Sequence, residues 1–266
     1  MYEKELSVAI NAVRLAGKKI MSYFNQQSNS VETKKDNTMV TKADVESNKI
    51  IVEEIRRNFP LDGIISEELS EIEGNRKWYV DPLDGTESFV RKSDEFGIHI
   101  GLCESGVPVL GVVYRVAKGD IYYSIKNQGA FREGKDGKFP LIISADSPLE
   151  AAVTSYGEKE LGKIADLLKA LEVKKIVRAA STGLRILKLA DGEADIYVVS
   201  SPLVKPWDIC APQAILQESG GKICYKDGSE VLYQPGMNGE KTIFFARTSR
   251  QLSLLVDKAK HIPINN

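Results

Sequence analysis

The pattern of apolar residues changes near residue 150, and this change limits the folds open to the chain. Between residues 97 and 131, apolar stretches are separated by turn signals at 104–106 and 117–119, which predicts an antiparallel meander. Beyond residue 150, short apolar strands alternate with amphipathic helices, as in α/β proteins. We therefore expect an α+β subdomain over residues 1–147, an α/β subdomain over 148–266, and a ligand cleft between them.

The N-terminal segment is predicted to be an amphipathic helix, because its apolar residues recur at steps of four and three. A second helix should follow Thr41 and end at Pro60. In the second half, the predicted helices cover residues 160–171, 183–190, 208–218 and 251–260. The predicted strands there are 151–155, 174–177, 195–199 and two near 223 and 242–245.

Composition excludes several classes of protein. The 266 residues carry 36 Lys and Arg against 37 Asp and Glu, so the basic excess typical of a nucleic-acid-binding protein is missing. No apolar run approaches the ~18 residues of a membrane span, and charges interrupt the N-terminus where a signal peptide would be apolar. The three cysteines lack CxxC spacing, which argues against a disulfide framework or a zinc site. We expect a cytoplasmic protein that binds no nucleic-acid polymer and no membrane.

The most informative motif is Asp-Pro-Leu-Asp-Gly-Thr at residues 81–86. Pro82 favours an extended Asp81, and Gly85 permits a sharp turn into a helix near Thr86. Two carboxylates and a backbone carbonyl from this segment would be hard oxygen ligands, which suit Mg²⁺. Taken alone, the motif is explained more readily as an Asx turn that caps a helix.

Other acidic residues fall at the ends of predicted elements, and each has a structural alternative. Glu67 follows a predicted strand, but paired glutamates are usually solvated surface. Asp44 opens the second helix, where it could complete a capping box with Thr41. Asp208 precedes an apolar helix and could be its N-cap. His99 lies inside an apolar strand, so we expect it to be structural.

Together these residues resemble the inositol monophosphatase superfamily. The resemblance rests on Asp44, Glu67-Glu68, residues 81–86, Trp207-Asp208-Ile209-Cys210-Ala211, residues 189–197 and Gly220-Gly221. It implies a layered αβαβα sandwich and a lithium-sensitive, Mg²⁺-dependent phosphatase with two to three ions in each site. It also implies a homodimer that acts on a small phosphorylated metabolite.

The resemblance further implies roles for individual residues. The implied metal ligands are Glu67, Asp81, the Leu83 carbonyl, Asp84 and Asp208. Asp44 and Thr86 would hold and activate the attacking water, with Glu67 assisting. The implied substrate contacts are Gly85, Thr86, Ser181, Thr182, Arg185 and Asp208, with the phosphate at the backbone of Gly85 and Thr86.

Within the superfamily, residues 86–96 and 106–114 resemble the 3'(2'),5'-bisphosphate nucleotidases, which remove the 3'-phosphate of 3'-phosphoadenosine 5'-phosphate. Arg185 lies where that branch carries a basic residue for the second phosphate, although it could equally be an exposed residue of its helix. Inositol monophosphatases carry a glutamate in the stretch that is 198–206 here, and this stretch holds no acid. The nucleotidase branch can carry a further arginine just after its tyrosine, where this chain has Val198 and Val199. Lys205 could supply the positive charge in its place.

Three alternatives remain open at this point. Within the same chemistry, the substrate could be an inositol phosphate, or it could be fructose 1,6-bisphosphate or histidinol phosphate. In a different class, the chain could bind a phosphorylated metabolite as a non-catalytic sensor. Every implied ligand is present, which disfavours the sensor.

Overall fold

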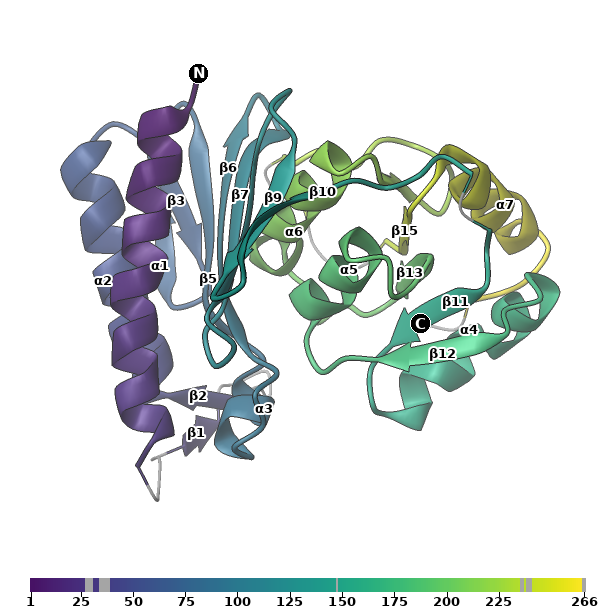
Figure 1. The fold of residues 1–266 in the computed structure, drawn as a ribbon, viewed down its shortest axis with the longest axis horizontal. Coiled ribbons are helices and arrows are strands. Elements are labelled where there is room, and N and C mark those ends of the chain that lie inside the picture. The colour runs from purple at the N-terminus through teal and green to yellow at the C-terminus, as the bar shows by residue number, and fades with distance from the viewer. Residues whose placement is uncertain (27–30, 34–38, 147, 235–236, 238–240, 265–266) are drawn as a thin grey trace.

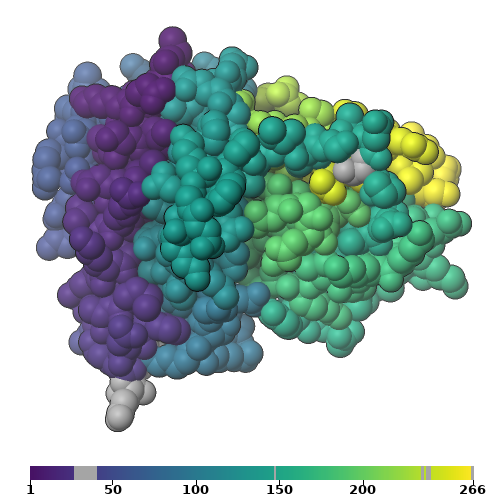
Figure 2. All heavy atoms as spheres, in the orientation of Figure 1, coloured from purple at the N-terminus to yellow at the C-terminus, as the bar shows by residue number. Residues whose placement is uncertain are grey.

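The computed structural model describes residues 1–266 apart from 27–30, 34–38, 147, 235–236, 238–240 and 265–266. Helices and sheets alternate in five layers, α-β-α-β-α (Figure 1), which confirms the predicted sandwich. The helices that build the layers are α1 (Glu3–Phe24) and α2 (Lys42–Asn58), then α5 (Thr182–Ala190) and α6 (Pro206–Glu218), then α4 (Glu158–Ala170) and α7 (Ser249–Ala259). Figure 2 shows the two lobes that result, with the purple-to-teal first half packed against the green-to-yellow second half.

The first sheet has eight strands in the order β10-β9-β8-β7-β6-β5-β3-β4. Its strands are β3 (Gly63–Ser66), β4 (Leu69–Ile72), β5 (Lys77–Asp84), β6 (Gly97–Glu104), β7 (Val107–Arg115), β8 (Asp120–Ile125), β9 (Ala130–Gly134) and β10 (Gly137–Leu141). Strands β5 to β10 form an antiparallel meander, which confirms the prediction and extends it by one strand at each end. A separate pair, β1 (Val31–Thr33) and β2 (Met39–Thr41), is also antiparallel.

The second sheet has the order β12-β11-β13-β15-β14. Its strands are β11 (Ala151–Thr154), β12 (Lys175–Arg178), β13 (Ile196–Val199), β14 (Lys222–Tyr225) and β15 (Ile243–Ala246). Strand β11 pairs in parallel with both β12 and β13, as expected for α/β units, whereas β15 is antiparallel to its two neighbours. The chain passes from the first sheet, which ends at Leu141, to the second, which begins at Ala151.

Each gap between layers holds its own apolar cluster. One cluster joins α1 and α2 to the first sheet, one joins α5 and α6 to both sheets, and one joins α4 and α7 to the second sheet. The predicted apolar face of α1 is confirmed, because Val13, Gly17 and Ile20 are buried. None of the helices among the described residues is both long enough and apolar enough to span a membrane.

Helix α6 differs from its predicted start. It begins at Pro206. The N–H groups in the first turn of a helix have no acceptor within the helix, so the missing N–H of a proline there loses no hydrogen bond. Asp208 is therefore the third helical residue, and the interpretation of Asp208 as the N-cap itself is wrong. Its Oδ2 instead accepts the backbone N–H of the N-cap residue Lys205 at 2.7 Å.

Candidate active site

A bulge in β5 turns two aspartates to the same face of the first sheet. Asp81 pairs with His99 and Asp84 with Gly97, so three residue steps on β5 face two on β6. In a regular strand, side chains three residues apart point to opposite faces. The extra residue cancels that difference, and both carboxylates point toward α5 and α6.

The segment after the bulge turns as the sequence predicts. Gly85 has φ of 89°, and an added Cβ there would lie 2.8 Å from the backbone oxygen of Glu95. Helix α3 (Thr86–Val90) begins at the next residue. The Oδ1 atom of Asp81 accepts the backbone N–H of Leu83 at 3.0 Å, so the Asx-type contact and the carboxylate cluster exist together.

Buried Asp44 and half-buried Thr86 form a pair at the edge of this turn. Oδ2 of Asp44 accepts hydrogen bonds from the N–H and the hydroxyl of Thr41, which completes the predicted capping box. Oδ1 faces the Thr86 hydroxyl at 2.9 Å, and that hydroxyl also lies 3.1 Å from the Leu83 oxygen. Burial raises the pKa of Asp44, although the hydrogen bonds from Thr41 and Thr86 partly offset the effect.

Asp81 and Asp208 are the most strongly perturbed carboxyls. Burial raises the pKa of Asp81 well above its ordinary value, and the charges of Glu67, Asp84 and Asp208 add to the effect. Burial likewise raises the pKa of Asp208, with the charge of Asp84 as the next cause. The two carboxyls are also within hydrogen-bonding reach of each other. Carboxyl groups crowded this closely can all be ionised at once only if cations neutralise their charge.

Asp84 has a different environment. Burial alone would raise its pKa, but the His99 ring, the Ser181 hydroxyl and the Arg185 guanidinium hold it below the ordinary value. Nε2 of His99 lies 3.1 Å from Oδ2 of Asp84, but the ring makes no hydrogen bond of ordinary geometry with the described residues. The backbone N–H of Gly183 also donates to Oδ2 at 3.2 Å. His99 is buried, as expected, yet it lies beside the site.

This donor set fits a divalent cation that prefers oxygen. Asp81, Asp84 and His99 offer ligand atoms that all lie within 4.8 Å of one another. Glu67, Leu83 and Asp208 line the same cleft as the two aspartates of β5. Carboxylate and carbonyl oxygens are the ligands that hard cations such as Mg²⁺ select.

The cleft has a volume of about 1030 Å³ and lies between the two lobes. Of the residues singled out in the sequence, those that line it are Glu67, Asp81, Leu83, Asp84, Gly85, Thr86, Ser181, Thr182, Arg185, Lys205 and Asp208. Asp44 lies behind Thr86 rather than on the wall. Tyr156 also lines the cleft and escaped the sequence analysis, although its position directly after a predicted strand was a usable signal.

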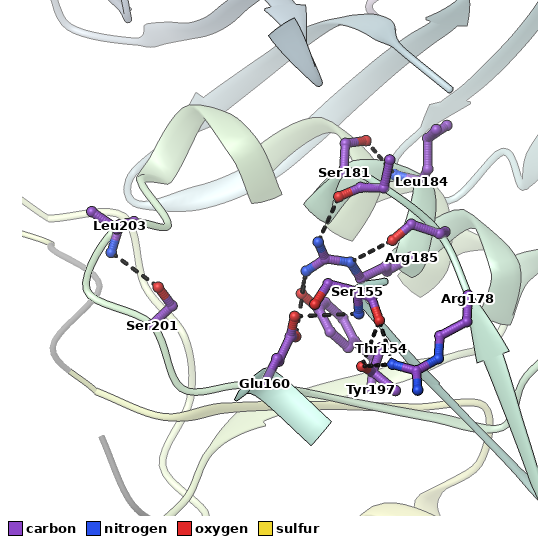
Figure 3. A network of polar contacts seen from close by, with 12 residues as sticks. Thr154, Ser155, Glu160, Arg178, Ser181, Leu184, Arg185, Tyr197, Ser201 and Leu203 are labelled. Carbon is purple, nitrogen blue, oxygen red and sulfur yellow. Dashed lines mark hydrogen bonds and ion pairs between the residues drawn. The ribbon is translucent and has the colours of Figure 1, made fainter. Parts of the chain in front are cut away.

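Arg185 is buried in α5, so the alternative that it is an exposed residue of its helix is wrong. Its Nε and Nη2 donate to the backbone oxygens of Ala179 and Ala180, at 3.0 and 2.6 Å. Its Nη1 donates to the Tyr197 hydroxyl at 2.7 Å and to Glu160 at 3.4 Å (Figure 3). These four contacts account for four of the five guanidinium hydrogens.

The two hydroxyl residues beside Arg185 also have protein partners. Ser181 is the N-cap of α5, where its oxygen accepts the Leu184 N–H at 3.4 Å, and its hydroxyl is among the groups that lower the pKa of Asp84. The Thr182 side chain lies close enough to the Tyr197 hydroxyl to lower its pKa, although burial dominates and raises it. Each hydroxyl has one hydrogen to donate, so a ligand oxygen that accepts from Ser181 or Thr182 takes up that hydrogen.

Comparison with known proteins relates nearly the whole chain to one family. The model of the inositol monophosphatase family matches residues 1–259. Among curated proteins, a 3'(2'),5'-bisphosphate nucleotidase CysQ of Buchnera aphidicola is 34% identical, over 88% of this chain and 89% of its own. A histidinol-phosphatase of Chlorobaculum parvum is 32% identical, over 82% and 84%. A fructose-1,6-bisphosphatase/inositol-1-monophosphatase of Thermotoga maritima is 30% identical, over 85% and 86%.

Solved structures agree with this placement. An inositol monophosphatase of Thermotoga maritima superposes with a TM-score of 0.81 at 27% identity, over 98% of both chains. The extragenic suppressor protein SuhB of Bartonella henselae gives 0.83 at 25% identity, over 98% of this chain and all of its own. With the family model, the curated relatives and the fold in agreement, the chain belongs to the inositol monophosphatase family of phosphatases.

Proposed function

We propose that this protein is a Mg²⁺-dependent phosphomonoester hydrolase that removes the 3'-phosphate of 3'-phosphoadenosine 5'-phosphate. The observation that carries the chemistry is the contact between buried Asp44 and half-buried Thr86, beside a cluster of carboxylates of which Asp81 and Asp84 are buried. The observation that favours a bisphosphate is Arg185, which lines the cleft and has one guanidinium hydrogen left over.

The proposed mechanism assigns the attacking water to Thr86. When the Thr86 hydroxyl donates to Asp44, its lone pairs remain to accept a hydrogen bond from that water. The water is thereby held and oriented for attack: its oxygen forms the new bond to phosphorus, and the bond from phosphorus to the ester oxygen breaks. The proton that the water loses passes by way of the Thr86 hydroxyl to Asp44, and the leaving oxygen takes up a proton from solvent in the cleft, so that the alcohol departs. Glu67, on the cleft wall, assists in holding the water.

A bound metal cluster supplies charge neutralisation and lowers the pKa of bound water. Glu67, Asp81, the Leu83 oxygen, Asp84 and Asp208 would hold two to three Mg²⁺ ions. The chain's own contribution is to bring these oxygens together from both lobes: Asp81 and Asp84 come from β5, whereas Asp208 comes from α6. Gly85 and Thr86 would bind the phosphate through their backbone N–H groups.

Other phosphate esters form the second candidate, because relatives of similar identity are named as a histidinol-phosphatase and as a fructose-1,6-bisphosphatase/inositol-1-monophosphatase. The inositol alternative is disfavoured by the loop before α6. An exposed leucine, Leu203, lines the cleft there, and residues 198–206 hold no acid that could bind sugar hydroxyls.

The test is phosphate release from a panel of esters, with Mg²⁺ and with EDTA. The panel holds 3'-phosphoadenosine 5'-phosphate, inositol 1-phosphate, fructose 1,6-bisphosphate and histidinol phosphate. We expect Mg²⁺-dependent release with the highest kcat/KM for the nucleotide. A higher value for another ester would overturn the substrate, and release unaffected by EDTA would overturn the metal chemistry.

A further inference from the structure

We propose that Tyr156 and Leu203 form a base-binding subsite in which the planar base of the substrate lies between an aromatic ring and an apolar side chain. This inference rests on the proposed function, because it names the part of the nucleotide that the outer cleft recognises. Both residues line the active-site cleft. Both are also exposed, Tyr156 at 62% and Leu203 at 59%.

Exposed aromatic side chains are rare in this protein. Among the described residues, only Phe139 and Tyr156 are aromatic side chains with large exposure, and Phe139 lies on the edge strand β10, outside the cleft. A large apolar side chain left in water inside a binding cleft is a place where a ligand can gain free energy by covering it. Tyr156 is the one such aromatic residue that the described chain places in the cleft.

The strand order of the second sheet points to the same place. Strands β11 and β13 are parallel neighbours. The chain continues from β11 into α4, which packs with the outer cluster, and from β13 it continues toward α6, which lies between the sheets. Ligands of α/β sheets bind in the crevice where adjacent strands send their connections to opposite faces. Tyr156 follows β11 and Leu203 follows β13, so the two residues flank that crevice.

The Tyr156 ring has a charged neighbour at its hydroxyl end. Partial burial, and then the Glu95 carboxylate in the loop between α3 and β6, raise the pKa of the Tyr156 hydroxyl. The ring face stays open to solvent. A tyrosine has two side-chain torsions, so fixing it against a base costs little conformational entropy, and bases stack on aromatic rings whatever their sequence identity.

Leu203 lies in the cleft lining, and a hydrogen bond holds its backbone. Its N–H donates to the Ser201 hydroxyl at 3.3 Å. Figure 3 shows this Ser201–Leu203 turn well separated from the group around Arg185 and Glu160. An apolar contact therefore stands apart from the cationic contact, as a ligand with a base at one end and phosphates at the other requires.

Charge and size are consistent with such a ligand. Arg91 and Lys205 line the cleft in addition to Arg185, so the cleft holds cations that can bind the phosphates. The volume of about 1030 Å³ lies just above the ~300–1,000 Å³ typical of small-molecule sites. A sugar phosphate alone would leave much of that volume to water.

The test compares substrates with and without a base. KM is measured for 3'-phosphoadenosine 5'-phosphate and for its stable base-free analogue, 1,2-dideoxyribose 3,5-bisphosphate, using Tyr156→Ala, Tyr156→Phe, Leu203→Ser and the control Phe139→Ala. Removing the ring should raise the nucleotide KM about 10-fold, from the ~1–3 kcal/mol typical of a base–aromatic stack. Tyr156→Phe and Phe139→Ala should stay within about twofold, and the base-free KM should not change.

Three results would overturn the subsite, two from the kinetics and one from a binding titration. Equal effects of Tyr156→Ala on both substrates would show that the ring does not contact the base, and Tyr156→Phe as harmful as Tyr156→Ala would assign the role to the Glu95 contact. Titration of Mg²⁺-loaded protein with adenosine 5'-phosphate separates the two proposals. Binding weakened by Tyr156→Ala would support the subsite even if the nucleotide were not hydrolysed, whereas no binding by the wild type would overturn it.

Discussion

The Thr86 hydroxyl oxygen lies 2.9 Å from Oδ1 of Asp44, and the two side chains come from segments 42 residues apart. Asp44 is fully buried behind Thr86 and does not line the cleft. Its influence on a reaction in the cleft must therefore pass through the Thr86 hydroxyl. The pair joins α2, which covers the outer face of the first sheet, to the turn that ends β5.

We expect Thr86→Val to lower kcat by about 100-fold or more, because positioned proton-transfer groups contribute ~10²–10⁴-fold. The isosteric valine keeps the volume but loses the hydroxyl that holds the water. Thr86→Ser keeps that hydroxyl and should retain most of the activity. The measurement is steady-state turnover of the best substrate with saturating Mg²⁺, and equal kcat for the valine and serine variants would contradict the assigned role.

Gly183 is the position where a single methyl group should damage the site most directly. An added Cβ would lie 2.1 Å from Cε1 of His99 and 2.9 Å from Oδ2 of Asp84. Such overpacking costs about 1–3 kcal/mol, so Gly183→Ala should lower both the free energy of unfolding and the Mg²⁺ affinity. Denaturant unfolding and metal titration calorimetry measure the two effects.

Gly162 provides the matched control for that substitution. It lies in α4, and an added Cβ there would meet nothing within 4 Å. Gly162→Ala should stabilise the helix by about 0.5–1 kcal/mol and leave metal binding unchanged. Parallel behaviour of the two alanine variants would show that the Gly183 contacts do not constrain the site.

Arg185→Ala should change both selectivity and stability. Loss of a charge-assisted hydrogen bond of ~1.5–3 kcal/mol would raise KM for 3'-phosphoadenosine 5'-phosphate about 10-fold or more, with a smaller rise for 3'-adenosine monophosphate. The fold should also weaken, because Ala179, Ala180 and Tyr197 lose their donor. Lys188→Ala removes a positive charge from the same helix, outside the cleft, and serves as control. An unchanged ratio of the two KM values would remove Arg185 from the second-phosphate site.

Removing metal should make stability depend on pH in an unusual direction. The folded-state pKa values of Asp81 and Asp208 are raised well above the ordinary value, about 3.9 in an unfolded chain. Between those values the folded state binds more protons than the unfolded state, so metal-free protein loses stability as pH rises through the folded pKa values. Added Mg²⁺ should restore stability most at high pH.

Thermal unfolding between pH 5 and 8, with EDTA or with Mg²⁺, tests this expectation. We expect the metal-free Tm to fall by at least the 2–4 °C that about 1 kcal/mol produces in a chain of this size. In the double variant Asp81→Asn, Asp208→Asn, the difference between EDTA and Mg²⁺ should largely disappear. A metal-free Tm that rises over this pH range in the wild type and not in the variant would contradict the assignment.

The sequence was sufficient for features that are local or periodic. The apolar face of α1, the capping box at Thr41 and the turn at Gly85 depend on neighbouring residues, and all three predictions are confirmed. The short strands β4 and β10 were missed, because their side chains are mostly exposed and give no apolar alternation.

Features that depend on register and on packing between lobes could not be predicted. The contact of His99 with Asp84 requires the bulge in β5 and the approach of Gly183 from α5. The burial of Arg185 depends on Tyr197 and Glu160, which come from β13 and α4. Nothing in the local sequence around Arg185 distinguishes such a residue from an exposed one.

The bulge in β5 makes the active site sensitive to chain length as well as to residue identity. Inserting one residue into β6 between Gly97 and His99 would allow regular pairing with β5, and it would turn the Asp84 carboxylate toward α1 and α2, into an apolar cluster. No substitution there changes the direction of a side chain in this way. Related sequences that keep every acidic residue of the site but change the number of residues at this bulge are therefore expected to have lost the reaction.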